Sequence, residues 1–114
     1  MEVKNTYYEI YQVDAKEKFA FRDWKRIKKF NLDWSFKPYK LMWAGFEDTK
    51  NDYELLEHLF VKFNLNHPFG FKGHSMSVSD IIKINHTVDE DKAKYYFCDA
   101  RGWKDITNEV KGEE

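Results

Sequence analysis

An alternation of apolar and polar residues with a period of two recurs along the chain and predicts β-strands. Aromatic and β-branched residues dominate these stretches, which cover 6–13, 39–46, 81–84, 93–98 and, more briefly, 103–106. Large apolar residues occupy both faces of 39–46, so we expect this strand to lie in the centre of a sheet. Gly45 within it predicts a bulge or a close approach by another segment.

Two further stretches have apolar residues at helical spacing. In 16–30 these residues fall on one broad face of a helix: Phe19, Ala20, Trp24, Ile27 and Phe30. In 52–64 they follow Asp52, a favourable N-cap residue: Leu55, Leu56, Leu59, Phe60 and Phe63. We therefore predict helices at 16–30 and 52–64, whereas the polar stretch 108–114 predicts a frayed terminus.

The order of these elements predicts an α+β fold. Because the last strands follow one another directly, we expect a small antiparallel sheet of about 4–5 strands with two helices packed on one face. A chain of 114 residues is the size of one domain, so we treat 1–114 as a single unit. Aromatic residues make up 18% of the chain, which argues against intrinsic disorder.

The most distinctive local pattern lies in 73–84, where serines alternate with apolar residues before an isoleucine-rich strand. Ser and Asp side chains bond to nearby backbone N–H groups, so this pattern predicts a polar turn leading into a half-buried strand. The alternative is a catalytic site of His74, Ser77 and Asp80. These residues are too close in sequence to form a triad on one rigid element, and no nucleophile-elbow glycine pattern surrounds them, so we favour the turn.

Charge is distributed unevenly, although the net charge is only −1. Between 16 and 40 there are nine basic and three acidic residues, a net charge of +6. Between 47 and 57 there are five acidic residues and one basic residue, a net charge of −4. This segregation predicts a molecule with one basic and one acidic side.

The basic side is the first candidate binding site. Five cations fall opposite the apolar face of the predicted helix 16–30: Lys18, Arg22, Lys25, Arg26 and Lys29. Such a run is commonly an ordinary solvated face. Alternatively, it contacts the phosphates of a nucleic acid or an acidic protein surface.

Secondary candidates lie just after the basic stretch. Trp34 and Phe36 either cover one edge of the core or stack on bases. The acidic residues Glu47, Asp48 and Asp52 belong to a run that could imitate nucleic acid and occupy a basic groove.

No sequence pattern indicates a cofactor or a metal. The four histidines lack metal-ligand spacing, no phosphate-binding glycine loop is present, and the single cysteine, Cys98, lies in an aromatic strand that favours a core position. An acid/base pair such as Asp80 with Asp99 stays open, so enzymatic activity is undecided and a non-enzymatic protein is favoured.

Three observations lead us to expect a cytoplasmic protein without a membrane partner. The chain has no apolar run of the length of a membrane span. Residues 1–5 have no apolar region typical of a secretory signal. A single cysteine permits no intrachain disulfide, which fits a reducing compartment.

Two boxes of sequence carry a family resemblance. The first is His-Ser-Met-Ser-Val-Ser-Asp-Ile-Ile-Lys-Ile at 74–84, and the second is Tyr-Tyr-Phe-Cys-Asp-Ala-Arg-Gly-Trp at 95–103. Together they resemble the "Ser-Leu-Ser-Val-Ser-Asp-Val" and "Tyr-Tyr-Val-Asp-x-x-Gly-Phe" boxes of the YodL-like family. The replacements Met76, Phe97 and Trp103 remain apolar. The two boxes are typical of structural segments, a turn and a pair of strands, and the resemblance assigns no catalytic residue to this chain.

The resemblance implies a small accessory protein of a mobile genetic element, similar to domains found in phages, plasmids and conjugative elements of Firmicutes. We therefore expect a non-enzymatic inhibitor that binds a host defence nuclease or its guide RNA, in particular the RNA-guided nuclease of a type II CRISPR system. One alternative is an RNA-binding or RNA-cleaving domain, since the 77–82 turn is loosely similar to RNA-binding modules of the PUA type. Another is a protein that binds a host cytoskeletal or cell-shape protein.

Overall fold

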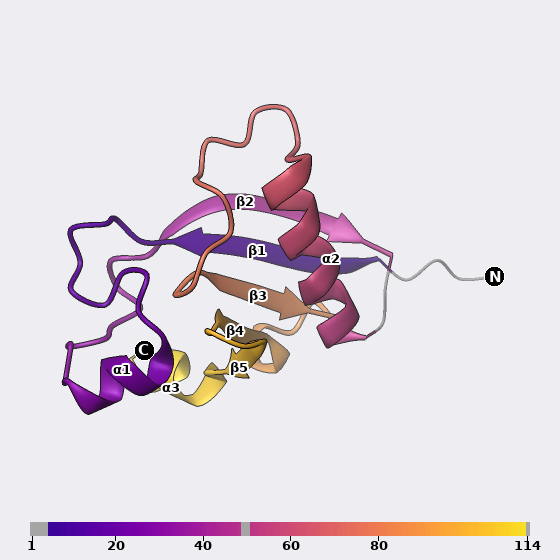
Figure 1. The fold of residues 1–114 in the computed structure, drawn as a ribbon. Helices are drawn as coiled ribbons and strands as arrows, with labels where there is room; N and C mark the ends of the chain where they lie inside the picture. The colour runs from indigo at the N-terminus through magenta and orange to yellow at the C-terminus, as the bar shows by residue number, and fades with distance from the viewer. Residues whose placement is uncertain (1–4, 49–50, 114) are drawn as a thin grey trace.

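Five antiparallel strands form one mixed α+β core in the computed structural model, which describes residues 5–48 and 51–113 (Figure 1). The strands lie in the order β2-β1-β3-β4-β5 and have these bounds: β1 Thr6–Gln12, β2 Lys40–Glu47, β3 Ile81–Asn85, β4 Lys94–Cys98 and β5 Trp103–Asp105. The helices are α1 Trp24–Lys29, α2 Asp52–Leu65 and α3 Thr107–Lys111, with a 3₁₀ turn η1 at Glu90–Lys92. All five predicted strands are confirmed.

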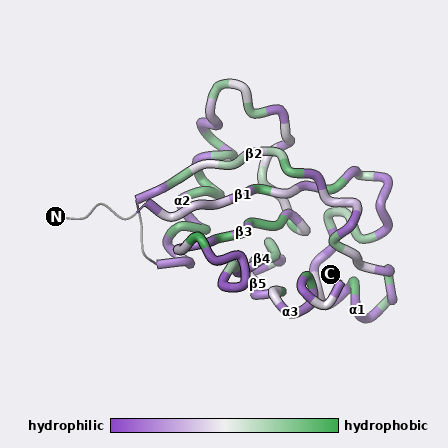
Figure 2. The backbone as a smooth tube through the Cα atoms, turned by 180° about the vertical axis from the view of Figure 1, so that it is seen from behind, coloured by the Kyte–Doolittle hydropathy of each residue, from purple (hydrophilic) through white to green (hydrophobic). Residues whose placement is uncertain are grey.

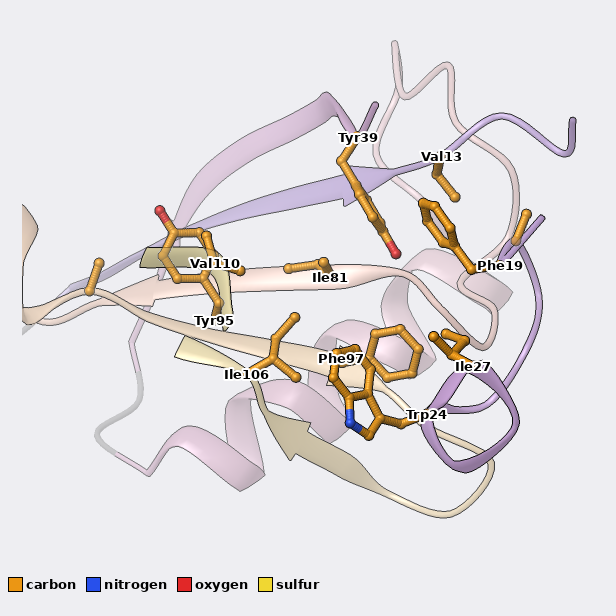
Figure 3. Close-up of a cluster of buried hydrophobic side chains, with 12 residues drawn as sticks. Val13, Phe19, Trp24, Ile27, Tyr39, Ile81, Tyr95, Phe97, Ile106 and Val110 are labelled. Carbon is orange, nitrogen blue, oxygen red and sulfur yellow. The ribbon is translucent and has the colours of Figure 1, made fainter. Parts of the chain in front are cut away.

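Strand alternation sends side chains into a separate core on each face of the sheet. Ile82 and Ile84 of β3 join a cluster with Leu55, Leu59 and Phe63 of α2. Ile81 points to the opposite face, into a second cluster that includes residues of α1 and α3 (Figure 3). Every residue of β3 is buried, so this strand is fully buried and not half-buried as predicted. In Figure 2 it is correspondingly hydrophobic, whereas the connection to β4 is hydrophilic.

Helices therefore cover both faces of the sheet, and the prediction of two helices on one face is wrong. On one face lies α2, with Leu55 and Leu56 completely buried. On the other lie Trp24 and Ile27 of α1 and Val110 of α3. The end of the chain was expected to fray, but Val110 is buried and forms part of a short helix. Glu114, the last residue of that prediction, lies outside the described residues.

The predicted helix 16–30 is reduced to the six residues of α1. Phe21 takes a left-handed conformation (φ 63°), and its backbone N–H donates to Ser79 Oγ at 2.9 Å, which interrupts any helix before α1. Asp23 then starts α1 as its N-cap by accepting a hydrogen bond from the Arg26 backbone N–H. Phe19 and Ala20, which the apolar periodicity assigned to the buried face of a helix, are buried but lie in turns. Phe30, the last residue of that face, is exposed.

The strand predicted to be central, β2, lies at the edge of the sheet and pairs with β1 alone among the described strands. Trp43 is half-buried and packs against the α2-side cluster, but Leu41 and Phe46 are exposed. Gly45 marks a close approach, because a Cβ atom there would lie 3.0 Å from the Tyr8 hydroxyl oxygen. A register shift between Ile10 and Tyr11 adds a bulge in the β1–β2 pairing.

Candidate functional site

The five predicted basic residues all lie exposed on one segment of the chain, which we call the basic segment: Lys18, Arg22, Lys25, Arg26 and Lys29. Lys18 and Arg22 lie in the turns before α1, and the other three lie on α1 itself. The basic segment is therefore a turn followed by a short helix, and not one continuous helix face as predicted. It is anchored by neighbouring apolar side chains, since Phe19 and Trp24 are both buried.

Little negative charge of the same molecule neutralises the basic segment. Arg26 lies 3.9 Å from the Asp23 carboxylate, an exposed contact of small energetic value. Lys29 lies over the Phe30 ring at 5.5 Å. Across residues 5–48 and 51–113, Lys18, Arg22 and Lys25 form no ion pair. These cations are free to meet an external anion.

Trp34 and Phe36 pack on the core cluster beside α1. The Trp34 ring centroid lies 5.3 Å from that of Trp24, and its indole N–H donates to the Tyr39 hydroxyl at 3.3 Å. Phe36 packs edge-on against Tyr11 at 5.1 Å. Neighbouring rings thus engage both aromatic side chains, which favours core packing over base stacking.

Side chains of the same molecule engage two of the three secondary acidic candidates. Glu47 pairs with Lys62 at 2.8 Å and with His58 at 3.2 Å, and its hydrogen bond raises the pKa of Lys62. Asp52 accepts a hydrogen bond from the Tyr96 hydroxyl at 2.6 Å and pairs with His86. Asp48 is exposed, and residues 49–50 of the acidic run lie outside the described part of the chain. Glu47 and Asp52 therefore already have partners within the molecule, whereas Asp48 is exposed.

The three residues of the possible catalytic site come together as a turn. Asp80 is buried, and its Oδ2 accepts hydrogen bonds from the Ser77 backbone N–H at 2.8 Å and from Gln12 Nε2 at 3.0 Å. Burial raises the pKa of Asp80 to about 7. His74 Nε2 lies 3.8 Å from Asp80 Oδ1, but the Ser77 hydroxyl donates to the Ser75 carbonyl at 2.9 Å. The serine is not presented to the histidine, so the geometry is that of a structural turn.

Sequence reasoning missed a polar network on the face of the sheet opposite α2. Lys83 Nζ lies 2.6 Å from Glu90 and 3.6 Å from Glu9. The Glu9 carboxylate also accepts hydrogen bonds from Tyr7 and Tyr11, each at 2.7 Å, and the bond to Glu9 raises the pKa of Tyr7 to about 12. Four of these residues line a shallow cavity of about 530 Å³: Tyr7, Glu9, Lys83 and Glu90. The sequence signal was a single charged residue in each of two otherwise uncharged strands, Glu9 in β1 and Lys83 in β3, which are cross-strand partners.

No described group of residues suggests metal or thiol chemistry. Within 5–48 and 51–113, His, Cys, Asp and Glu side chains nowhere gather in threes that could hold a metal ion. Cys98 is buried, and burial raises the pKa of its thiol to about 12, so it is protonated at neutral pH. In the same part of the chain, no helix has the length and apolar character that crossing a membrane requires.

Comparison with known proteins places the chain in a family. The profile of the YodL-like domain matches residues 7–108, which include β1 from its second residue, the other four strands, α1 and α2. No curated protein and no solved structure matches the chain. Both boxes quoted above lie inside the matched range, where they form the turn before β3 and the β4–β5 hairpin. The chain belongs to the YodL-like domain family.

Proposed function

We propose that this protein is a non-enzymatic inhibitor that binds a host defence nucleoprotein, namely the RNA-guided nuclease of a type II CRISPR system, through the phosphates of its guide RNA. The observation that carries the proposal is the basic segment, whose exposed cations have, among residues 5–48 and 51–113, no carboxylate partner apart from the weak Arg26–Asp23 contact. Binding to phosphates releases counterions, so such cations attract a polyanion strongly.

The site's geometry supports binding without chemistry. The buried Asp80 belongs to a turn whose serine hydroxyl is bonded to a backbone carbonyl. The Cys98 thiol is buried and protonated. A small folded protein with an uneven charge distribution is suited to inhibition, because charge complementarity accelerates encounter and selects partners.

The test compares two variants of equal net charge. The first reverses the basic segment with Arg22→Glu, Lys25→Glu, Arg26→Glu and Lys29→Glu. The control reverses four exposed cations elsewhere: Lys72, Lys92, Lys94 and Arg101. Binding to the guide RNA and to the assembled nuclease–RNA complex is measured by fluorescence anisotropy over a series of salt concentrations.

We expect the first variant to lose binding and inhibition, and the control to keep both. Each phosphate contact contributes about 0.7–0.9 to the salt slope, so loss of four contacts lowers the slope by about three. Binding to free guide RNA with the same affinity as to the complex would instead favour the alternative of an RNA-binding domain. If both variants inhibit equally well, the basic segment is not the contact surface, and a host protein such as a cell-shape protein becomes the better candidate.

A further inference from the structure

The outer edge of β2 is an unusual sheet edge. It offers an eight-residue strand, and no proline interrupts it. Leu41 and Phe46 along it are 51% and 63% exposed. The opposite edge of the sheet, β5, has only three residues. A long edge strand with exposed large apolar side chains is a template for pairing with another strand.

Pairing with β1 shows which face each side chain of β2 occupies. Leu41, Ala44 and Phe46 lie opposite Tyr11, Glu9 and Tyr7, on the face that carries the polar network. The ring centroids of Phe46 and Tyr7 are 5.3 Å apart. Trp43, Gly45 and Glu47 point to the other face, where Glu47 contacts Lys62 of α2. Met42 is the bulged residue that the register passes over.

These positions make the strand complementary to itself. An antiparallel pair of β2 strands related by a two-fold axis at Ala44 places Ala44 opposite its own mate. Met42 has no partner residue in the pairing with β1. If Met42 is also left without a partner in the dimer, Phe46 lies opposite Leu41 of the second copy. At the ends of the strand, Glu47 lies opposite Lys40 of the second copy, which is an opposite-charge pair. Apolar residues meet apolar residues and the charges match.

We propose that the protein forms a two-fold symmetric dimer in which the β2 strands of two copies pair antiparallel, extending one sheet across both molecules. The occupant of this edge is a second copy of the chain. This proposal stands independently of the binding function of the basic segment, because β2 contributes none of the basic segment's residues. The dimer covers the exposed Leu41 and Phe46 side chains and presents two basic segments.

Sedimentation equilibrium of the full chain tests the oligomeric state. We expect the wild-type protein to approach twice its 13.9 kDa mass as concentration rises. The variant Leu41→Asp with Phe46→Asp should remain monomeric, because it places carboxylates opposite one another on both sides of the axis. The control Leu65→Asp with Phe69→Asp changes two other exposed apolar residues, 82% and 104% exposed, and should dimerise like the wild type. Far-UV circular dichroism and thermal unfolding check that both variants fold.

A cysteine at the axis gives a second measurement that does not depend on weakening the interface. In Ala44→Cys, the two new thiols face each other across the axis, where directly opposed Cα atoms lie about 4.5–5.5 Å apart. This separation falls within the disulfide range of about 4.4–6.8 Å. We expect oxidation to link most of the protein into dimers, whereas Ala100→Cys, exposed in the β4–β5 turn, should stay monomeric. A wild-type protein that stays monomeric, or equal cross-linking of the two variants, overturns the proposal.

Discussion

At the scale of single residues, the protein places buried ionisable side chains beside hydrogen-bond and ion-pair partners. The Lys83 side chain is 8% exposed, yet it lies between the carboxylates of Glu9 and Glu90. Asp80 is 1% exposed and receives hydrogen bonds from Gln12 and from the Ser77 backbone. A buried charge is tolerated where hydrogen bonds or an opposite charge compensate for its loss of hydration. When burial shifts the pKa of such a group, the free energy of unfolding depends on pH.

The raised pKa of Asp80 predicts a pH dependence of stability. Its folded-state pKa of about 7 lies above the ordinary 3.8, so the folded protein binds one more proton than the unfolded chain between these values. The free energy of unfolding should therefore fall as pH rises through this window, by about 1.4 kcal/mol per pKa unit of difference. Urea unfolding from pH 4 to pH 8 measures this slope.

The variant Asp80→Asn is the control for that slope, because an amide keeps an acceptor oxygen for the Ser77 N–H but does not titrate. We expect its stability relative to wild type to increase towards pH 8. Parallel pH profiles for the two proteins would show that Asp80 does not cause the pH dependence. They would point to another group that both proteins contain, such as His74, which lies beside the carboxylate.

At the scale of elements, local capping decides where the basic segment becomes helical. Phe21 in a left-handed conformation ends the preceding turns, and Asp23 supplies the N-cap of α1. The hydrogen bond from Phe21 to Ser79 ties this junction to the turn that precedes β3, 58 residues later in the chain. Contacts distant in sequence therefore position the cations of α1.

Removing the cap should loosen α1 without changing the core. Asp23→Ala loses the hydrogen bond from the Arg26 backbone N–H and should lower the free energy of unfolding by about 1 kcal/mol. Asp23→Asn retains an oxygen acceptor, so its free energy of unfolding should stay within a few tenths of a kcal/mol of the wild-type value. Chemical denaturation of the three proteins checks the order, and equal losses in both variants would show that the Arg26 ion pair matters more than the cap.

At the scale of the whole molecule, the proposed dimer would affect binding by the basic segment. A dimer through β2 carries two basic segments on one rigid sheet, and a polyanion that reaches both binds more tightly through effective concentration.

The monomeric variant with Leu41→Asp and Phe46→Asp should therefore lose affinity in a length-dependent way. On an RNA long enough to span both basic segments, we expect affinity to fall by at least about tenfold, since bivalent binding can contribute a gain of about 10²–10⁴. On an RNA that fills one segment, affinity should change little. Anisotropy titrations with the two lengths measure the difference, and an equal loss on both would indicate direct contact by β2.

Sequence patterns located the strands and α2 correctly, because these depend on local periodicity. The same patterns misjudged elements that depend on distant partners. Apolar residues on both faces of 39–46 suggested a central strand, but they serve a bulged edge strand. The apolar stripe of 16–30 reflected burial of Phe19 in a turn and Trp24 in a helix.

The amino-acid sequence by itself determined the α+β class, the positions of the strands, the polar turn around Asp80 and the clustering of cations between residues 16 and 40, since each follows from neighbouring residues. Only the tertiary structure decided that helices cover both faces, that β2 forms an edge, and that Lys83 joins Glu9 and Glu90. Strand order and the partners of a buried charge depend on residues far apart in the chain, and periodicity in one segment carries no information about which distant segment lies beside it.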